Sequence, residues 1–291
     1  MKARQADRAW GRRWSGGRAS RGLLAAALLL LATGCARPDD WIETRPDLAT
    51  RARQDPASFL APALAQWDGL RGMVGSWQVR ASRGISSRTL DTQIHLMRDA
   101  LVQIEVLSPG FTTEGFVGVS TREVGLWVSE DPCLYRGPNQ PGAFARALGI
   151  ELAPEDIIAA LMGFAVPYPE RATAVWDETE RRIRVASSGT TAWLHPLTLR
   201  FERFVVATPS GPISGRYESW TEGDVPVPAR LRVEGAAEDI TLELRLASEW
   251  NANPAGLDEA FFEELPVTDA VDCPLDELAR EGGLLRRGLQ R

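Results

Sequence analysis

The chain has 291 residues, of which 25% are charged, and a formal net charge of −6 at pH 7. Residues 1–34 hold seven basic side chains and one acidic one, so residues 35–291 keep 26 basic against 38 acidic groups, a net charge of about −12. This excess of acid argues against nucleic acid as a partner and against electrostatic attraction to anionic lipid heads.

Residues 1–34 have the pattern of a bacterial export signal. A basic stretch ends at Arg21, an apolar run occupies residues 23–32, and small residues precede Cys35. Ten apolar residues are too few to cross a bilayer, which needs about 20. The sequence around Gly34 and Cys35 resembles a lipobox, which implies that the chain is cut before Cys35 and that this cysteine is acylated. Ala32 stands where leucine is commonest in that signal.

Two other interpretations of this segment stay open. The chain could be an ordinary secreted protein with a chance cysteine at its cleavage site, or Arg12 and Arg13 could belong to a twin-arginine export signal. If Cys35 is lipidated, it anchors the chain without a transmembrane helix, because two or more acyl chains hold a protein stably. Ala36 stands where inner-membrane lipoproteins usually carry Asp, which favours the outer membrane.

The remaining chain is predicted to be one mostly β domain. Residues 35–54 are polar and suit a tether, and residues 56–71 have apolar positions at helical spacing. Alternating strand patterns then occupy residues 77–81, 92–97, 101–107, 115–119, 124–128, 172–178, 181–187, 190–195, 197–207, 213–221, 227–234 and 239–248. Residues 154–163 begin with Pro and acidic residues and end at Gly, as a capped helix does. From residue 251 onward we expect an irregular acidic tail.

This order of elements resembles that of the LolA/LolB-like lipoproteins. The motifs that carry the resemblance are WQVRA at 77–81, LSPGFTTE at 107–114, LGIEL at 148–152 with the helix that follows, and VPVPARL at 225–231. Together they span about residues 60–250. The resemblance implies an incomplete antiparallel β-barrel of about 11 strands over residues 55–250, whose concave apolar face is covered by two or three helices and holds acyl chains.

The residues that would face such an acyl cavity follow from the strand alternation and from the helix at 154–163. They are Trp77, Val79, Ile94, Leu96, Ile104, Val106, Phe116, Ile157, Leu161, Met162, Phe201 and Leu244. In a closed sandwich the same residues would be plain core, and the sequence leaves both possibilities open. The helix is the natural lid, and a methionine in it suits a pocket that adapts to different acyl chains.

Three further residues are singled out. Cys133 and Cys273 are the two cysteines left after Cys35, and in an oxidising envelope such a pair is either a disulfide or two buried free thiols. The resemblance implies an exposed apolar residue on the loop after the strand at 101–107, which inserts into the membrane. Phe111 is the candidate, although Gly110 could occupy that position and Phe111 could fold into the core.

Catalytic chemistry is not indicated. His95 and His195 lack metal-ligand spacing, and neither lies near a plausible nucleophile in sequence. We therefore expect no enzyme, no cofactor and no metal. The partners implied are an acylated lipoprotein or lipid, the outer membrane through the lipid anchor, and a periplasmic lipoprotein carrier. The alternative is an accessory or structural envelope lipoprotein that acts through protein contacts without lipid transfer.

Overall fold

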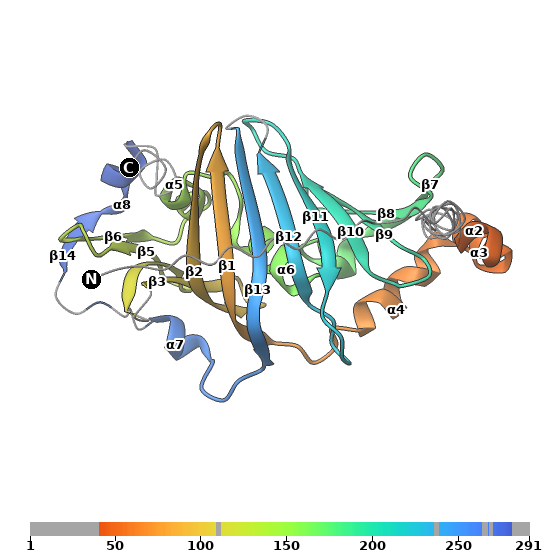
Figure 1. The fold of residues 1–291 in the computed structure, drawn as a ribbon, viewed down its shortest axis with the longest axis horizontal. Coiled ribbons are helices and arrows are strands. Elements are labelled where there is room, and N and C mark those ends of the chain that lie inside the picture. Colours follow the sequence, from red (N-terminus) through yellow and green to blue (C-terminus); the bar gives the residue numbers. More distant parts are fainter. Residues whose placement is uncertain (1–40, 109–111, 236–238, 264–266, 268–269, 281–291) are drawn as a thin grey trace, which may run out of the picture. The chain divides into compact units, whose positions relative to one another are not determined.

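The computed structural model describes residues 41–108, 112–235, 239–263, 267 and 270–280 (Figure 1). The chain divides into two compact units, residues 1–46 and 47–291. The described part of the first unit is the short helix α2 (Trp41–Thr44), together with Arg45 and the first residue of α3. The predicted signal, Cys35 and Phe111 lie outside the described residues.

The described residues of the second unit form one open sheet of fourteen strands. Its strands are β1 (Gly72–Arg83), β2 (Ser86–Met97), β3 (Leu101–Leu107), β4 (Thr113–Val119), β5 (Glu123–Val128), β6 (Cys133–Pro138), β7 (Thr173–Asp177), β8 (Arg182–Ser187), β9 (Thr190–Leu194), β10 (Phe201–Val206), β11 (Ile213–Trp220), β12 (Pro228–Gly235), β13 (Ile240–Ala252) and β14 (Val271–Pro274). Their spatial order is β14-β6-β5-β4-β3-β2-β1-β13-β12-β11-β10-β9-β8-β7. Neighbours are antiparallel except β14 and β6, which are parallel.

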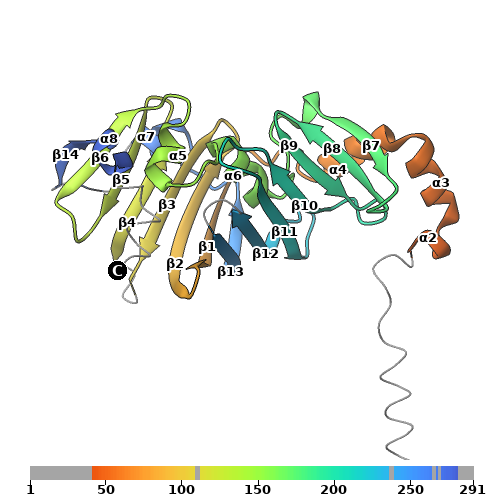
Figure 2. The same cartoon turned by 90° about the horizontal axis from the view of Figure 1, so that it is seen from above.

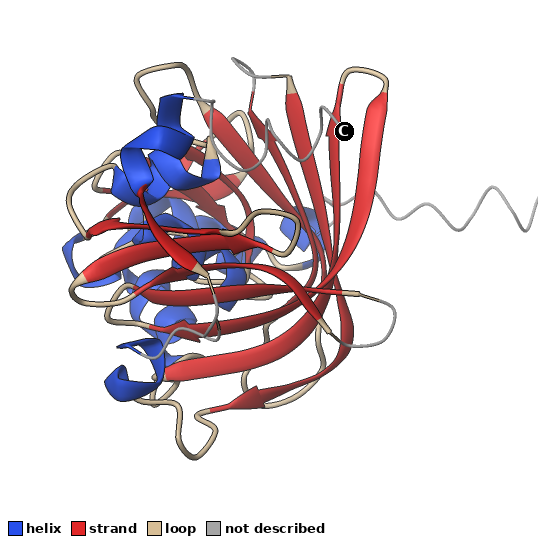
Figure 3. Ribbon diagram, turned by 90° about the vertical axis from the view of Figure 1, so that its left-hand side faces the viewer, coloured by secondary structure: helices blue, strands red, loops and turns tan. Residues whose placement is uncertain are grey.

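The sheet confirms the predicted fold class, with more strands than the roughly eleven expected. It is mostly antiparallel and does not close on itself, because β14 and β7 each have a single neighbour (Figure 3). The strands that the sequence pattern missed are β6 and β14. Both strands are short and end in proline, and neither has an alternating burial pattern. In β6, for example, the adjacent residues Leu134 and Tyr135 are both buried.

The helices of the second unit are short. They are α3 (Pro46–Gln54), the 3₁₀ helix η1 (Pro56–Phe59), α4 (Leu60–Ala65), α5 (Ala143–Leu148), α6 (Pro154–Met162), the 3₁₀ helix η2 (Pro169–Arg171), α7 (Glu259–Glu263) and α8 (Leu275–Arg280). Helices α5 and α6 lie on the concave side of the sheet (Figure 2). Among the described residues, no helix is long and apolar enough to cross a membrane.

Two segments differ from their prediction. Most of the expected tether is helical, and Ala52 of α3 is buried in the main core cluster. The expected irregular tail forms the end of β13, then α7, β14 and α8. The described parts of this segment bury apolar side chains against the rest of the chain: Phe262 of α7 and both Leu275 and Leu278 of α8 are buried. The sequence did not predict these elements, because a few apolar residues in an acidic segment do not show that the segment packs against distant parts of the chain.

Candidate functional site

The concave face of the sheet, here called the trough, is lined by apolar side chains that the strand register places on one side. Residues paired across antiparallel strands point to the same face. Val79 of β1 pairs with Leu244 of β13, and Ile94 of β2 pairs with Ile104 of β3. These four belong to or pack against the main core cluster, so they mark the trough side of their strands.

The structure brings most of the predicted cavity residues together. Six are buried within the main core cluster: Trp77, Ile94, Leu96, Leu161, Met162 and Phe201. Four pack against that cluster and are half-buried: Val79, Ile104, Ile157 and Leu244. Val106 lies on the trough side of β3, two residues from Ile104, and is also half-buried. In the state described, the deepest part of the trough is therefore filled by protein side chains.

Phe116 does not lie in the trough. It pairs with Glu105, whereas the next residue, Val117, pairs with Ile104 on the trough side. Phe116 is thus buried on the convex face of β4. The prediction failed because residues 115–119 of β4 are all buried, so both faces of this stretch are covered and no polar alternation shows which face Phe116 occupies.

Helix α6 covers the trough as predicted, and both of its ends are fixed. Pro154 starts the helix, and the carboxylate of Asp156 accepts hydrogen bonds from the Ala153 amide (3.3 Å) and the Thr190 hydroxyl (3.2 Å). Burial raises the pKa of Asp156. The helix ends at Gly163, whose φ of +93° favours glycine.

An aromatic cluster, which the sequence did not reveal, lies at the end of α6. The ring of Trp67 is 6.5 Å from that of Phe164 and 6.3 Å from that of Trp220, and Trp220 is 4.9 Å from Tyr217. The indole of Trp67 donates to the Pro226 carbonyl at 2.9 Å. These residues come from distant parts of the chain, so only the folded sheet brings them together.

Two polar atoms in the main core cluster have no hydrogen-bond partner among the described residues. They are the indole nitrogen Nε1 of Trp77 and the hydroxyl Oη of Tyr217, and both are buried. Burial raises the pKa of Tyr217 well above its ordinary value, so the hydroxyl keeps its proton. A buried donor without an acceptor costs about 1–3 kcal/mol. The trough therefore contains unused hydrogen-bond donors in apolar surroundings.

A groove of about 830 Å³ opens beside the start of α6 rather than beneath it. Phe144, Ile150 and Leu152 are buried residues that line it, and charged Arg146 and Glu155 also line it. None of the twelve predicted cavity residues lines this groove. Its volume is in the range of small-molecule sites, and it adjoins both core clusters, because Ile150 belongs to one and Phe144 to the other.

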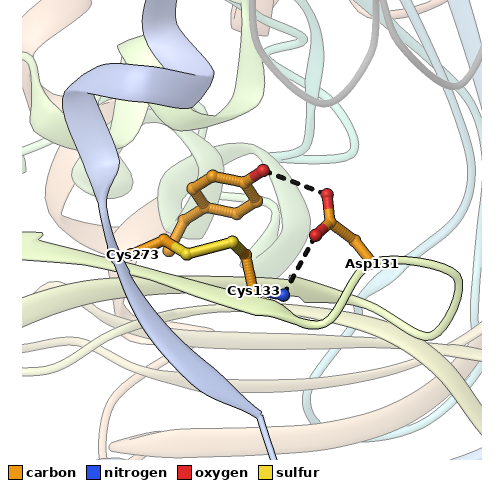
Figure 4. Close-up of a disulfide and its surroundings, with 4 residues drawn as sticks. Asp131, Cys133 and Cys273 are labelled. Atoms are coloured by element: carbon orange, nitrogen blue, oxygen red, sulfur yellow. Dashed lines mark hydrogen bonds between the residues drawn. A yellow bond between two sulfur atoms is a disulfide. The ribbon is translucent and has the colours of Figure 1, made fainter.

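A disulfide joins Cys133 of β6 to Cys273 of β14 (Figure 4). Asp131 supports it from the preceding turn, accepting hydrogen bonds from the Cys133 amide and the Tyr135 hydroxyl, each at 3.0 Å. The bond fixes β14 and the following helix α8. Leucines of α8 then pack with α5 in a second core cluster over β4–β6. The pairing that the sequence left open is thus a disulfide.

Both histidines are held by contacts with neighbouring residues. His95 lies on the convex face, opposite to that of Ile94, and its ring stacks on Phe261 of α7 with centroids 4.8 Å apart. Its Nε2 is 3.7 Å from Glu105 Oε1. Burial lowers the pKa of His95, and Glu105 partly opposes that shift. His195 Nδ1 accepts a hydrogen bond from the Leu197 amide. Within the described residues, no cluster of His, Cys, Asp or Glu could hold a metal.

Comparisons with known proteins identify the fold. No family model and no curated protein matches the chain. A domain from Vibrio parahaemolyticus, named as an outer membrane lipoprotein-sorting protein, matches with a TM-score of 0.51 at 11% identity, over 70% of this chain and 94% of that one. A DUF1329 family protein from Desulfovibrio piger gives a TM-score of 0.49 at 14% identity, over 71% and 96% of the two chains. A LolA superfamily protein from Nitrosomonas europaea gives 0.46 at 11%, over 70% and 96%. The likeness to the Vibrio domain shows that the chain has the LolA/LolB-like fold expected from the sequence.

Proposed function

We propose that this chain is an outer-membrane lipoprotein that binds the acyl chains of lipoproteins or lipids in the trough beneath α6 and aids their localisation to the outer membrane. It is anchored through Cys35, receives its cargo from a periplasmic lipoprotein carrier, and catalyses no reaction. The observation that carries the proposal is the pair of buried donors without acceptors, Trp77 Nε1 and Tyr217 Oη, in an apolar face covered by a helix. The fold shared with a domain named for lipoprotein sorting supports it.

The chemistry of an acylated ligand matches this surface. An acyl chain replaces the side chains of α6 against the sheet, so apolar burial is exchanged rather than lost. Its ester carbonyl provides the acceptor that the buried donors lack in the closed state. Met162 of the lid is an adaptable packing partner for chains of different lengths. Transfer is then non-covalent, from one apolar surface to another.

Replacing Tyr217 by phenylalanine tests this role. Tyr217→Phe removes an unpartnered hydroxyl, so we expect the ligand-free protein to become more stable while its affinity for an ester-linked lipid falls about threefold to tenfold. Affinity for the matching ether-linked lipid, which has no carbonyl, should stay the same. Tyr135→Phe is the control: its hydroxyl is used by Asp131, so that variant loses stability and keeps ligand affinity.

The proposal fails if the protein, purified under mild conditions, carries no lipid in native mass spectrometry and binds neither lipid in titration. That result favours the second candidate, an accessory envelope lipoprotein that acts through protein contacts. One observation supports this alternative: residues such as Trp77 and Phe201 are fully packed in the described state, as in an ordinary core.

A further inference from the structure

The tip of the β1–β2 hairpin carries the most exposed large apolar side chain of the described residues. Ile85 has a relative exposure of 107%, whereas Val271, the next such residue, reaches 64%. A turn of two residues, Gly84 and Ile85, joins the strands, and Gly84 has a φ of +57°. Ile85 thus projects into solvent without a packing partner, which is unfavourable for an apolar side chain unless something else covers it.

The hairpin holds this tip firmly. β1 and β2 are paired without interruption from Gly72 opposite Met97 to Arg83 opposite Ser86. On its other side, β1 pairs with β13 as far as Arg83 opposite Ile240. The last residue before the turn, Arg83, is therefore held from both sides, which restricts where the turn places Ile85. A rigid tip loses little conformational entropy when it binds.

Two arginines flank the tip on the trough side. Arg83 pairs with the buried Ile240, and Arg88 pairs with the buried Ala81, so both arginines share the face of core residues. Neither has an ion pair or hydrogen bond with another described residue. Among the described residues, a carboxylate oxygen of Asp239 lies 3.8 Å from where a Cβ on Gly84 would be.

We propose that this tip docks on a phospholipid bilayer, with Ile85 entering the acyl boundary and Arg83 and Arg88 hydrogen-bonding lipid phosphates. An isoleucine gains free energy when it leaves water, and the guanidinium fork matches phosphate oxygens. The acidity of the chain as a whole opposes long-range attraction to anionic lipid, so the contact acts at short range. Docking here turns the tip-side end of the trough toward the bilayer, because half-buried Val79 and Leu244 continue the same face below the arginines.

The test places a fluorophore at the tip. In the full chain with Cys35→Ser, the variant Ile85→Cys offers a single free thiol, because Cys133 and Cys273 are bonded to each other. The matched control is Leu197→Cys, an exposed apolar residue at the opposite end of the strands. Each labelled protein is mixed with vesicles of phosphatidylethanolamine and phosphatidylglycerol that contain a lipid carrying a quencher in its acyl chain. The N-terminal segment is identical in both, so it affects both labels alike.

We expect the label at position 85 to shift to the blue and to be quenched, and the label at position 197 to stay in water. Adding Arg83→Gln and Arg88→Gln should reduce the quenching at position 85 about tenfold, and Asp239→Asn should increase it. Equal signals at positions 85 and 197 would overturn the docking, and an unchanged signal in the double arginine variant would overturn the phosphate contacts. These readings do not require a lipid inside the trough, so they remain informative if the acyl-binding proposal fails.

Discussion

Gly163 at the end of α6 lies directly against the ring of Trp220. A Cβ at this position would be 2.6 Å from Cζ3 of Trp220, and φ is +93°. Gly163→Ala should therefore combine a clash with an unfavourable backbone conformation and lower the free energy of unfolding by about 2–4 kcal/mol. Gly189→Ala separates the two effects, because Gly189 has a φ of +83° with nothing within 4 Å. Denaturant unfolding of both variants is the measurement, and equal losses would show that Trp220 gives way.

The disulfide should contribute stability and hold the C-terminal helix. Replacing both Cys133 and Cys273 by alanine removes a crosslink between residues that are 140 positions apart in the sequence. We expect a loss of about 2–4 kcal/mol and faster hydrogen exchange in α8, whose leucines pack beside the bond. Mass spectrometry after alkylation without reductant checks that the two cysteines are bonded in the native protein. Two alkylated cysteines in the native protein would contradict the pairing.

His95 should make stability fall as the solution becomes acidic. Its pKa is lowered in the folded protein by burial beneath Phe261, so the unfolded chain binds the proton more readily. Stability is then constant above about pH 6.5, the ordinary histidine value, and decreases below it. His95→Gln should flatten the curve between pH 7 and 5. Asp156, whose pKa is raised by burial, changes stability in the opposite direction, because the folded state binds its proton more readily than the unfolded chain does. The measurement is thermal unfolding across this pH range. If His95→Gln kept the wild-type dependence of stability on pH, His95 would not be the group responsible.

Cys35 should be the site of the membrane anchor. Cys35→Ser removes the thiol that a lipobox requires, so labelled palmitate should no longer be incorporated and the protein should leave the membrane fraction. Wild-type and variant cells are compared after metabolic labelling and fractionation. A wild type that takes up no label, or a variant that stays membrane-bound, would show that the chain is not a lipoprotein of this kind.

The sequence predicted the fold well where local chemistry decides it. Alternation identified twelve of the strands, and the proline and acidic start of α6 with Gly163 at its end defined the lid. It failed where contacts are distant or strands are buried on both faces. Phe116 was placed on the wrong face, and β14 was missed because its pairing with β6 depends on a segment more than a hundred residues away.

The sequence predicted most of the apolar residues that line the trough, but it did not predict the unpartnered polar atoms among them. Trough residues such as Ile94 and Leu244 follow from strand period alone. The unpartnered hydroxyl of Tyr217 does not, because whether a tyrosine finds a hydrogen-bond partner depends on neighbours from other strands. The ordinary sequence around Gly84 and Ile85 likewise gives no sign that this isoleucine is fully exposed.

The pairing of β1 with β13 has a consequence for how the protein folds. Strands β1–β6 and β7–β13 are each successive neighbours in the sheet and can form from local hairpins, but the seam between them joins Met73 to Ala252. That contact must wait until the chain has been made as far as β13, and loop closure over such a distance is slow. Until then, the long edge of β1 is open to pairing with other chains. Variants that delay the formation of this seam should therefore aggregate before they lose native stability.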